Sequence, residues 1–397
     1  MTQLSDNVNR LQASATLAMT AKSMELQAQG IDIITLSVGE PDFPTPEHIK
    51  VAAKQAIDDG WTRYSPGMGY ADLRQAIVAK LQNENGLTYK PEEIVVSNGA
   101  KQSVCNAIIS LVGPSDEVLI PAPYWVSYPQ MVLLSGATPV YIQTTFESGF
   151  KVTPEQLEQA ITPHTKAIIL CSPCNPTGAV YSQQELDALA LVLERHPQVI
   201  VIADEIYEHI NYLGTHASFA KAPNMFERTV LINGVSKAYA MTGWRIGFMA
   251  APVWLAKACN KLQGQYTSGP CSVSQKAALA AYTGSQQCVE DMRQAFQRRR
   301  DLIVSLAKEV PGFEVNVPDG AFYLFPKCDS LFGKQYNGVV INNRTDLAHY
   351  LLEYAHVSTV GGDAFGAPDC IRLSYATSEE NITEALSRIK RAIEQLS

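Results

Sequence analysis

The sequence predicts an α/β protein whose central sheet is mostly parallel. Two observations lead to this prediction: short runs rich in Val and Ile recur along the first two thirds of the chain, and helical or turn sequence separates them. Short continuous apolar runs are typical of strands that are buried on both faces of a parallel sheet. The runs are Glu93–Ser97, Glu117–Ile120, Pro139–Ile142, Ala167–Cys171, Val199–Ala203, Thr229–Ile232 and Arg245–Met249.

Helical patterns flank these runs. The segments 46–57 and 71–83 have apolar residues every three or four positions, as at Leu73, Ile77 and Leu81, which places those residues on one helix face. A further helical pattern covers Gln102–Leu111. Strands that alternate with such helices are typical of layered α/β domains.

Beyond about residue 284 the pattern changes. A long charged helix is predicted over 286–308, and its Arg298, Arg299 and Arg300 are expected on a solvated or ion-paired face. Apolar segments at 313–317 and 321–325, a strand candidate at 371–375, and helices at 346–356 and 378–395 follow, the last with a capping box over Thr377–Glu380.

The chain of 397 residues is long enough for two domains. We expect a large domain over residues 46–284 and a smaller α+β domain that combines residues 285–397 with an N-terminal arm, residues 1–45. The formal net charge of −8 argues against a nucleic-acid partner or an anionic membrane. No apolar run is long enough to span a bilayer, and the first residues do not fit a secretory signal.

Eight scattered cysteines fit a reducing cytoplasm better than a disulfide scaffold. Cys171 and Cys174 form a C-x-x-C motif, which occurs in redox and zinc sites. A zinc site would need two further ligands nearby, and the sequence offers no second such motif. We therefore expect two reduced cysteines beside a functional site, and no metal.

Polar residues follow several of the predicted strands at the point where each strand ends. Asp204 follows one buried strand, and Lys237 follows the next after a glycine turn. In open α/β sheets, ligands bind outside the carboxyl ends of the strands. A buried carboxylate at such a place needs a cationic partner, and a desolvated lysine there is a candidate amine nucleophile. The alternatives are a helix-capping aspartate and a surface lysine.

Other strand ends carry groups suited to a phosphate and a flat ring. Gly99, Ala100 and Lys101 start a helical pattern, where free backbone N–H groups bind phosphate. Arg245 follows Lys237 closely, and its planar guanidinium binds two phosphate oxygens at once. Trp125 could stack on a planar ring or pack in the core. An amine, a carboxylate, a phosphate cradle and an aromatic ring together are what pyridoxal phosphate requires.

Several motifs, in this order, make the chain similar to a known family. They are Ser37–Phe43, Tyr64–Gly67, Pro123–Pro129, Asn175–Gly178, Asp204–Tyr207, Ser236-Lys237 with Thr242–Gly247, and Ile371–Tyr375. With these motifs, which extend over nearly the whole chain, the sequence resembles fold-type I pyridoxal-phosphate aminotransferases (class I/II), and among them the bacterial aspartate aminotransferase branch.

The resemblance implies roles for individual residues toward the cofactor. Lys237 holds pyridoxal phosphate as a Schiff base and then moves the proton at the substrate's alpha carbon. Asp204 pairs with the pyridinium nitrogen, and Trp125 stacks on the ring. The remaining cofactor contacts implied are Asn175 and Tyr207 to the ring's phenolate oxygen, and Gly99, Ala100, Lys101, Ser236, Arg245 and, from the neighbouring subunit, Tyr64 around the phosphate. A homodimer with shared active sites follows from the last of these.

The resemblance also implies how the substrate is held. Arg372 takes the alpha-carboxylate, assisted by Gly39 and Asn175, with Trp125 nearby. Lys101, with Ser14 and Thr16, would take the distal carboxylate of a dicarboxylic amino acid. Ser14 and Thr16 could instead simply cap the helix that follows.

The resulting expectation is reversible ping-pong transamination between L-aspartate and 2-oxoglutarate. Alternatives within the same branch are another preferred substrate, such as prephenate, alanine or an aromatic amino acid. A carbon–sulfur lyase would share Lys237 and Asp204 but release pyruvate and ammonia. A transcriptional regulator with an aminotransferase-like module would need a basic DNA-binding segment, which does not precede residue 46.

Overall fold

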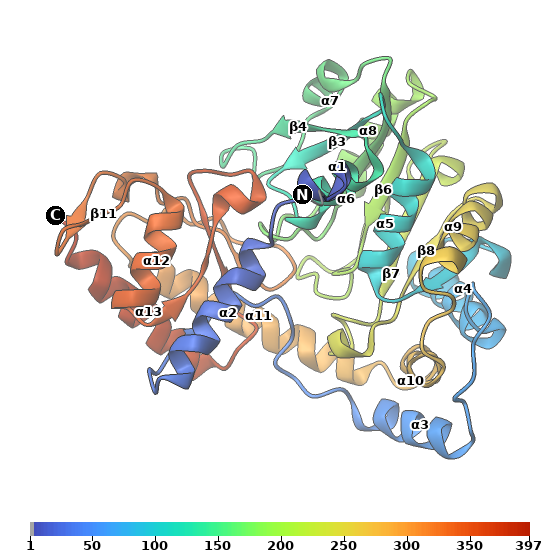
Figure 1. Ribbon diagram of the computed structural model, residues 1–397, viewed down its shortest axis with the longest axis horizontal. Helices are drawn as coiled ribbons and strands as arrows, with labels where there is room; N and C mark the ends of the chain where they lie inside the picture. Colours follow the sequence, from blue (N-terminus) through green and yellow to red (C-terminus); the bar gives the residue numbers. More distant parts are fainter. Residues whose placement is uncertain (1–3) are drawn as a thin grey trace.

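The computed structural model describes residues 4–397. All seven predicted strands lie in one seven-stranded sheet of order β2-β8-β7-β6-β5-β3-β4 (Figure 1). The predicted α/β class with a mostly parallel sheet is confirmed. The strands are β2 (Ile94–Ser97), β3 (Glu117–Ala122), β4 (Thr138–Gln143), β5 (Thr165–Cys171), β6 (Ile200–Asp204), β7 (Thr229–Gly234) and β8 (Gly247–Ala250).

The pairing of the strands explains why apolar and polar residues do not alternate along them. Strands β4, β3, β5, β6 and β7 pair in parallel, whereas β8 runs antiparallel to both of its neighbours. In β6, Ile202 packs into a different core from Val201 and Ala203. Because side chains of a strand point alternately to the two sheet faces, each face of β6 carries an apolar core.

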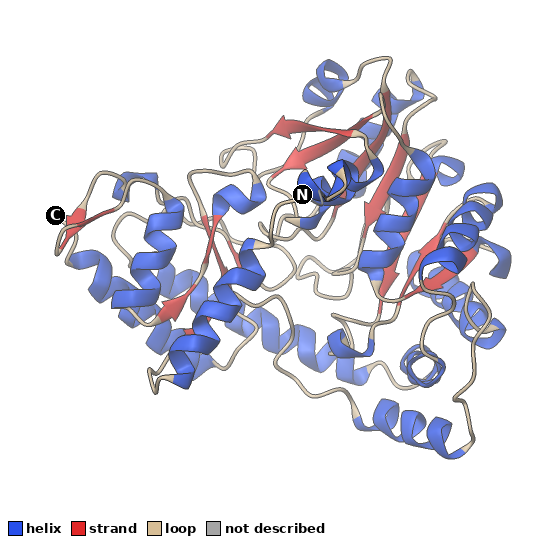
Figure 2. Cartoon of the chain, in the orientation of Figure 1, coloured by secondary structure: helices blue, strands red, loops and turns tan. Residues whose placement is uncertain are grey.

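Helices cover both faces of the sheet (Figure 2). One core joins the sheet to α5, α6 and α9, and on the other face two cores join it to α7 and α8 and to α3, α4 and α10. These helices are α3 (Glu47–Asp58), α4 (Ala71–Asn85), α5 (Ala100–Leu111), α6 (Ser127–Ser135), α7 (Pro154–Ala160), α8 (Gln183–Glu194), α9 (Val253–Tyr266) and α10 (Ser272–Thr283).

The remaining elements surround a separate core, which is formed largely by residues 292–396. Its sheet has the order β13-β14-β9, all antiparallel. The elements are α11 (Gln287–Ala307), β9 (Tyr323–Leu324), β10 (Gln335–Tyr336), β11 (Val339–Val340), α12 (Arg344–Tyr354), β12 (Val357–Ser358), β13 (Val360–Gly361), β14 (Ile371–Ser374) and α13 (Glu379–Glu394).

The N-terminal segment lies with this separate core. It contains α1 (Asp6–Asn9), α2 (Ala15–Ala28) and β1 (Ile34–Thr35), and β1 pairs in parallel with β12. Helix α2 packs against α12, where Met19 shares a core with Ala348 and Leu352 (Figure 1), which fits the expected N-terminal arm. The domain boundaries at residues 45 and 284 stay a prediction.

Local sequence explains many helix boundaries. Ser182 and Glu185 form a capping box at the start of α8, and Thr153 and Gln156 form another at α7. Helix α4 ends at Gly86, whose φ of 65° is in the left-handed region that glycine adopts easily.

Two details of the sequence interpretation differ from the structure. Arg245 precedes β8, because its φ of 58° ends the turn and cannot continue a strand. Ser378 caps α13 by accepting from the Asn381 N–H, so the expected capping box does not form. The ion-paired face expected at Arg298, Arg299 and Arg300 is present, and Arg299, which pairs with Asp42, is also buried.

Within residues 4–397, no helix has the length and apolar character needed to cross a membrane.

Candidate active site

A pocket of about 530 Å³ lies at the carboxyl ends of β5, β6 and β7. The order of the strands predicted that the polar side chains at the strand ends would lie here. Of the predicted site residues, those that line the pocket are Ser14, Thr16, Gly39, Ala100, Lys101, Trp125, Asn175, Asp204, Tyr207, Ser236, Lys237, Arg245 and Arg372. Gly99 lies directly behind Arg245, and Tyr64 lies elsewhere.

Asp204 is the last residue of β6, and a tight turn follows it. The Glu205 N–H donates to the Ile232 carbonyl of β7, and the Glu208 N–H donates to the Glu205 carbonyl. The turn therefore starts while the chain is still held by the sheet. It brings Asp204 and Tyr207 into the same pocket.

The Asp204 carboxylate is buried and accepts a hydrogen bond of 2.6 Å from the Tyr128 hydroxyl. Burial raises the pKa of Asp204 to about 6, although the bonds from Tyr128 and from the Ile206 N–H lower it. Within the described part of the chain, no Lys, Arg or His side chain forms an ion pair with Asp204. A buried carboxylate of this kind is suited to hold a cationic ring nitrogen.

Lys237 faces the same pocket from the loop after β7. Its Nζ donates to the Gly39 carbonyl at 2.6 Å and lies 5.7 Å from the centre of the Tyr207 ring. Burial lowers the pKa of Lys237 to about 8, with smaller contributions from Arg372 and Arg245. A lysine with a lowered pKa has a larger unprotonated fraction, which is the nucleophilic form.

The start of α5 and Arg245 form a cradle for an anion. The guanidinium of Arg245 donates to the Thr242 carbonyl at 2.8 Å and to the Asn98 carbonyl at 3.2 Å. Gly99 has a φ of 83°, and a Cβ atom there would collide with this guanidinium. Gly247 is in equally close contact with the Ala100 backbone. The first N–H groups of α5 and Arg245 thus lie together, as phosphate binding requires.

Arg372 is a buried guanidinium at the opposite side of the pocket. It donates to the Asn175 side-chain oxygen at 2.9 Å and to the Ser37 carbonyl at 2.7 Å, and its Nε has no hydrogen-bond partner. No carboxylate in residues 4–397 pairs with Arg372. Because an unpaired buried charge is costly, this arginine is suited to a carboxylate brought by a ligand.

Aromatic side chains complete the walls. The Tyr207 and Tyr323 hydroxyls are 2.9 Å apart, and Arg372 lies 4.5 Å from the centre of the Tyr323 ring. Trp125 packs edge-to-face on Tyr128, at 5.4 Å between ring centres. Burial raises the pKa of Tyr207 well above its ordinary value, so its hydroxyl is a hydrogen-bond donor.

The residues predicted for a distal carboxylate lie at the pocket's outer side. The Lys101 side chain is exposed, and its Nζ lies 5.0 Å from the centre of the Trp125 ring. Ser14 caps α2 by accepting from the Leu17 N–H at 3.4 Å, so the capping interpretation holds for Ser14. Thr16 follows in the first turn of α2. Both residues also line the pocket.

Tyr64 does not reach this pocket. Its side chain is 96% exposed on the loop between α3 and α4. Such exposure of an aromatic residue is what its predicted contact with a neighbouring subunit would require.

The sequence interpretation assigned no role to two residues of the site, Tyr128 and Tyr323. Tyr128 lies within the quoted motif Pro123–Pro129, but only the fold reveals that it contacts Asp204. Tyr323 lies in a two-residue strand, too short for any alternation to show which side chain faces the pocket.

The Cys171 side chain lines the pocket, whereas Cys174 is buried beneath it. All eight cysteines of the chain are free thiols in the structure.

The residues present fit pyridoxal phosphate. Asp204 offers a buried carboxylate that has no ion-pair partner in the described part of the chain, and Lys237 offers a buried amine in the same pocket. Arg245 with the start of α5 offers a phosphate site, closed so tightly at Gly99 that a Cβ atom would disturb it. A second cavity, of about 930 Å³ between α2 and α12, is larger but contains none of these groups.

Comparisons with known proteins agree with this geometry. The model of the family described as aminotransferase class I and II matches residues 31–389. The aspartate/prephenate aminotransferase of Cereibacter sphaeroides is 49% identical, over 98% of this chain and 98% of its own length. A bifunctional aspartate aminotransferase and glutamate/aspartate-prephenate aminotransferase of Petunia hybrida is 48% identical, over 98% of this chain and 82% of its own length.

Solved structures show the same similarity. The aspartate aminotransferase of Rhizobium meliloti superposes with a TM-score of 0.96 at 45% identity, and each chain is covered to 100%. That of Thermus thermophilus, solved with maleate, has a TM-score of 0.92 at 42% identity, over 99% of this chain and 100% of the other.

Proposed function

This chain belongs to the class I and II aminotransferases, which use pyridoxal phosphate, and on that premise we propose that it transfers the amino group of L-aspartate to 2-oxoglutarate. The products would be oxaloacetate and L-glutamate, and the reaction would be reversible. The observation that carries the proposal is the buried Arg372, which lines the same pocket as Lys237 and has no carboxylate partner among residues 4–397.

Pyridoxal phosphate, when bound, supplies a carbonyl that condenses with amines and a ring that stabilises negative charge at the substrate's alpha carbon. The chain's own groups would do the rest. Lys237 would hold the cofactor and then, once released, move the proton at the alpha carbon. Asp204 would keep the ring nitrogen protonated. Tyr207 and Asn175 would donate to the ring oxygen, Trp125 would stack on the ring, and Ser236 with Arg245 would hold the phosphate.

The substrate would be oriented between two cationic groups. Arg372, with Asn175 and Gly39, would bind the alpha-carboxylate, and its planar guanidinium fixes the orientation. Lys101, with Ser14 and Thr16, would bind the distal carboxylate. The relative from Thermus thermophilus was solved with maleate, a four-carbon dicarboxylate, which supports a substrate of this class.

A second candidate activity is transamination with prephenate, which the names of several relatives include. Prephenate also carries two carboxylates, so the same Arg372 and Lys101 would bind it. Alanine and aromatic amino acids lack the second carboxylate and would leave Lys101 without a partner. A carbon–sulfur lyase would use the same Lys237 and Asp204 for a different reaction.

We further propose a homodimer in which Tyr64 of each subunit reaches the phosphate site of the other. The high exposure of Tyr64 supports this, because a single chain gives this side chain no packing partner to account for its position. The free cysteines agree with a reducing cytoplasm as the location.

The function is tested by following both products in a mixture of the enzyme, L-aspartate and 2-oxoglutarate. We expect oxaloacetate and glutamate in equal amounts, without ammonia. Pyruvate and ammonia released from a cysteine S-conjugate supplied in place of aspartate, with no glutamate formed from aspartate, would identify a carbon–sulfur lyase. Activity with prephenate and glutamate but none between aspartate and 2-oxoglutarate would replace the first proposal by the second.

A further inference from the structure

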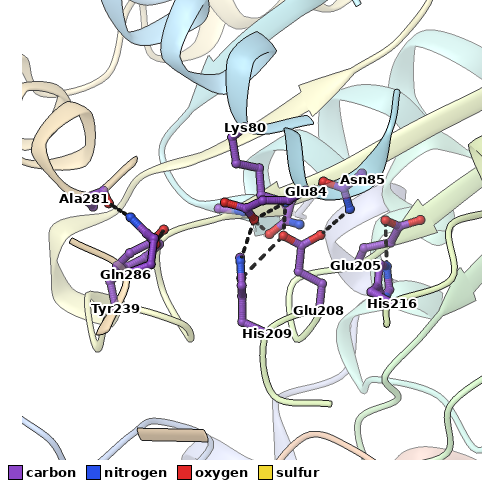
Figure 3. Close-up of polar contacts among 12 residues, drawn as sticks. Lys80, Glu84, Asn85, Glu205, Glu208, His209, His216, Tyr239, Ala281 and Gln286 are labelled. Atoms are coloured by element: carbon purple, nitrogen blue, oxygen red, sulfur yellow. Dashed lines mark hydrogen bonds and ion pairs between the residues drawn. The ribbon is translucent and has the colours of Figure 1, made fainter. Parts of the chain in front are cut away.

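The turn that carries Asp204 and Tyr207 has a second face, directed away from the pocket. Its Glu205, Glu208 and His209 side chains point toward α4 and the loop around residue 216 (Figure 3). Glu205 and Glu208 are buried, at 3% and 5% exposure. Buried carboxylates are costly unless they are paired, so this face must have a compensating arrangement.

Helix α4 supplies most of that arrangement. The Lys80 ammonium, 5% exposed, donates to Glu208 and to the Asn85 side-chain oxygen, the latter at 2.8 Å, and lies 3.5 Å from Glu84. The Asn85 amide donates to the second oxygen of Glu208 at 3.0 Å. We call the set the buried ion cluster, with Glu84 at its exposed edge; its members are Lys80, Glu84, Asn85, Glu205, Glu208, His209 and His216.

The two ends of the buried ion cluster are also fixed. Glu205 accepts from Ser218 at 2.7 Å and contacts the His216 imidazole at 2.9 Å. His209 contacts Glu84 at 2.9 Å, and its ring lies 6.3 Å from that of Tyr239. Tyr239 is two residues beyond Lys237, and Figure 3 shows it beside the cluster. The cluster therefore backs both the Asp204–Tyr207 turn and the Lys237 loop.

The carboxylates and imidazoles of this cluster have the spacing of metal ligands. A bound metal ion does not fit the geometry, because the Lys80 ammonium already lies among these oxygens and hydrogen-bonds to Glu208. The positive charge that the carboxylates need is thus built into the chain.

We propose that the buried ion cluster is a positioning device: by fixing the turn from behind, it sets the hydrogen bonds that Asp204 and Tyr207 make in the active site. This inference rests on the proposed roles of those two residues. Lys80, Asn85 and Glu208 are positioning residues, since none of them lines the pocket.

The contacts of Glu208 provide a sharp test. Its two oxygens each accept from a different donor, Lys80 on one side and Asn85 on the other. In Glu208→Gln one oxygen becomes an NH₂ group. Whichever way that amide is turned, and even if Asn85 turns as well, one donor then faces another donor. The substitution preserves size but forces the turn to shift.

The experiment compares Glu208→Gln with the unaltered holoenzyme by spectroscopic titration of the visible band of the lysine-bound cofactor. The visible band reports the protonation of the nitrogen that links Lys237 to the cofactor. A hydrogen bond from Tyr207 to the ring oxygen would lower the pKa of this nitrogen. We expect this pKa to rise in Glu208→Gln by roughly half a unit to one unit, as weakening one such hydrogen bond would do. We expect kcat to fall roughly tenfold with little change in KM.

Two further variants separate positioning from general loss of stability. Leu157→Ala removes a buried side chain of α7 that belongs neither to the pocket nor to the cluster, and should lower the melting temperature while leaving the cofactor pKa unchanged. Asn85→Ala removes one donor to Glu208 and should raise the pKa by a smaller amount; it decides the matter if Glu208→Gln does not fold.

The inference would be overturned if the pKa reported by the band were unchanged in both cluster variants. It would also be overturned if the pKa changed equally in Leu157→Ala. If the unaltered protein itself showed no visible band or no transamination, the proposed function would fail instead, so the two failures are distinguishable.

Discussion

Lys237 is the residue on which the proposed chemistry depends, because it is a buried amine in the same pocket as Asp204 and Arg372. Replacing it with alanine should reduce transamination by at least about 10³-fold, since no other buried amine lines the described pocket. The fold should persist, because a buried ammonium contributes little net stability. Circular dichroism and a melting curve check the fold. Substantial residual transamination by a folded Lys237→Ala protein would contradict the assignment.

Lys101 decides substrate choice in this account. In Lys101→Gln, kcat/KM for aspartate should fall roughly 10- to 100-fold, because a charge-assisted contact to the distal carboxylate is lost. The value for alanine, which lacks that carboxylate, should change much less. Lys166→Gln, at an exposed lysine outside the pocket, is the matched control. Equal losses for both substrates would mean that Lys101 serves the phosphate turn.

The buried Asp204 predicts how the free energy of unfolding of the cofactor-free protein depends on pH. Because burial raises the pKa of Asp204 from 3.8 to about 6, the folded state binds this proton more tightly than the unfolded state does. Stability from this group is therefore full below about pH 4 and is lost as pH rises to about 6.

Relative to Asp204→Asn, the cofactor-free protein should thus lose up to about 3 kcal/mol in free energy of unfolding between pH 4 and pH 7. Urea unfolding at several pH values measures this. A difference that is constant with pH would show that Asp204 has an ordinary pKa.

At the scale of elements, the start of α5 is shaped by Gly99. In Gly99→Ala the new Cβ atom would collide with the Arg245 guanidinium, so the dissociation constant of pyridoxal phosphate should rise roughly tenfold or more. Gly86→Ala is the matched control, because Gly86 also has positive φ, of 65°, but has open space around it. Fluorescence titration with the cofactor compares them. Equal affinities in both variants would remove Gly99 from the phosphate site.

The elements show how far the sequence could predict this fold. Each of the seven apolar runs became a strand of one sheet, because strands buried on both faces need continuous apolar sequence. The strand-end residues Asp204 and Lys237 were predicted because chain order places them at one edge of the sheet, whereas Asn175 was predicted only from the family resemblance. The bridge from Glu314 to Lys327 was not predicted, since it depends on tertiary contacts alone.

The same limit explains what was missed in the site. Tyr128 and Tyr323 act through contacts with Asp204 and Tyr207, which are 76 and 116 residues away along the chain. The buried ion cluster joins Lys80 to Glu208, 128 residues apart. Local periodicity carries no signal for such pairs, and a charged residue on a helix such as α4 is ordinarily expected at the surface.

At the scale of the whole molecule, the shared-site homodimer is the main prediction. Tyr64→Phe removes only a hydroxyl from a side chain that is 96% exposed, so the stability of a single subunit should not change. We expect the variant to remain dimeric in sedimentation experiments but to bind pyridoxal phosphate several-fold more weakly, since one hydrogen bond to the phosphate is lost. An active monomer, or unchanged cofactor affinity, would contradict a shared site.

The most direct test of the central claim is the absorbance spectrum of the purified protein before and after L-aspartate is added. The account predicts a visible band from the cofactor on Lys237 that moves to the near ultraviolet as the amino group is taken up. A band that moves only with another amino acid would retain the aminotransferase and overturn aspartate as donor. A colourless protein that pyridoxal phosphate cannot reconstitute would contradict the account.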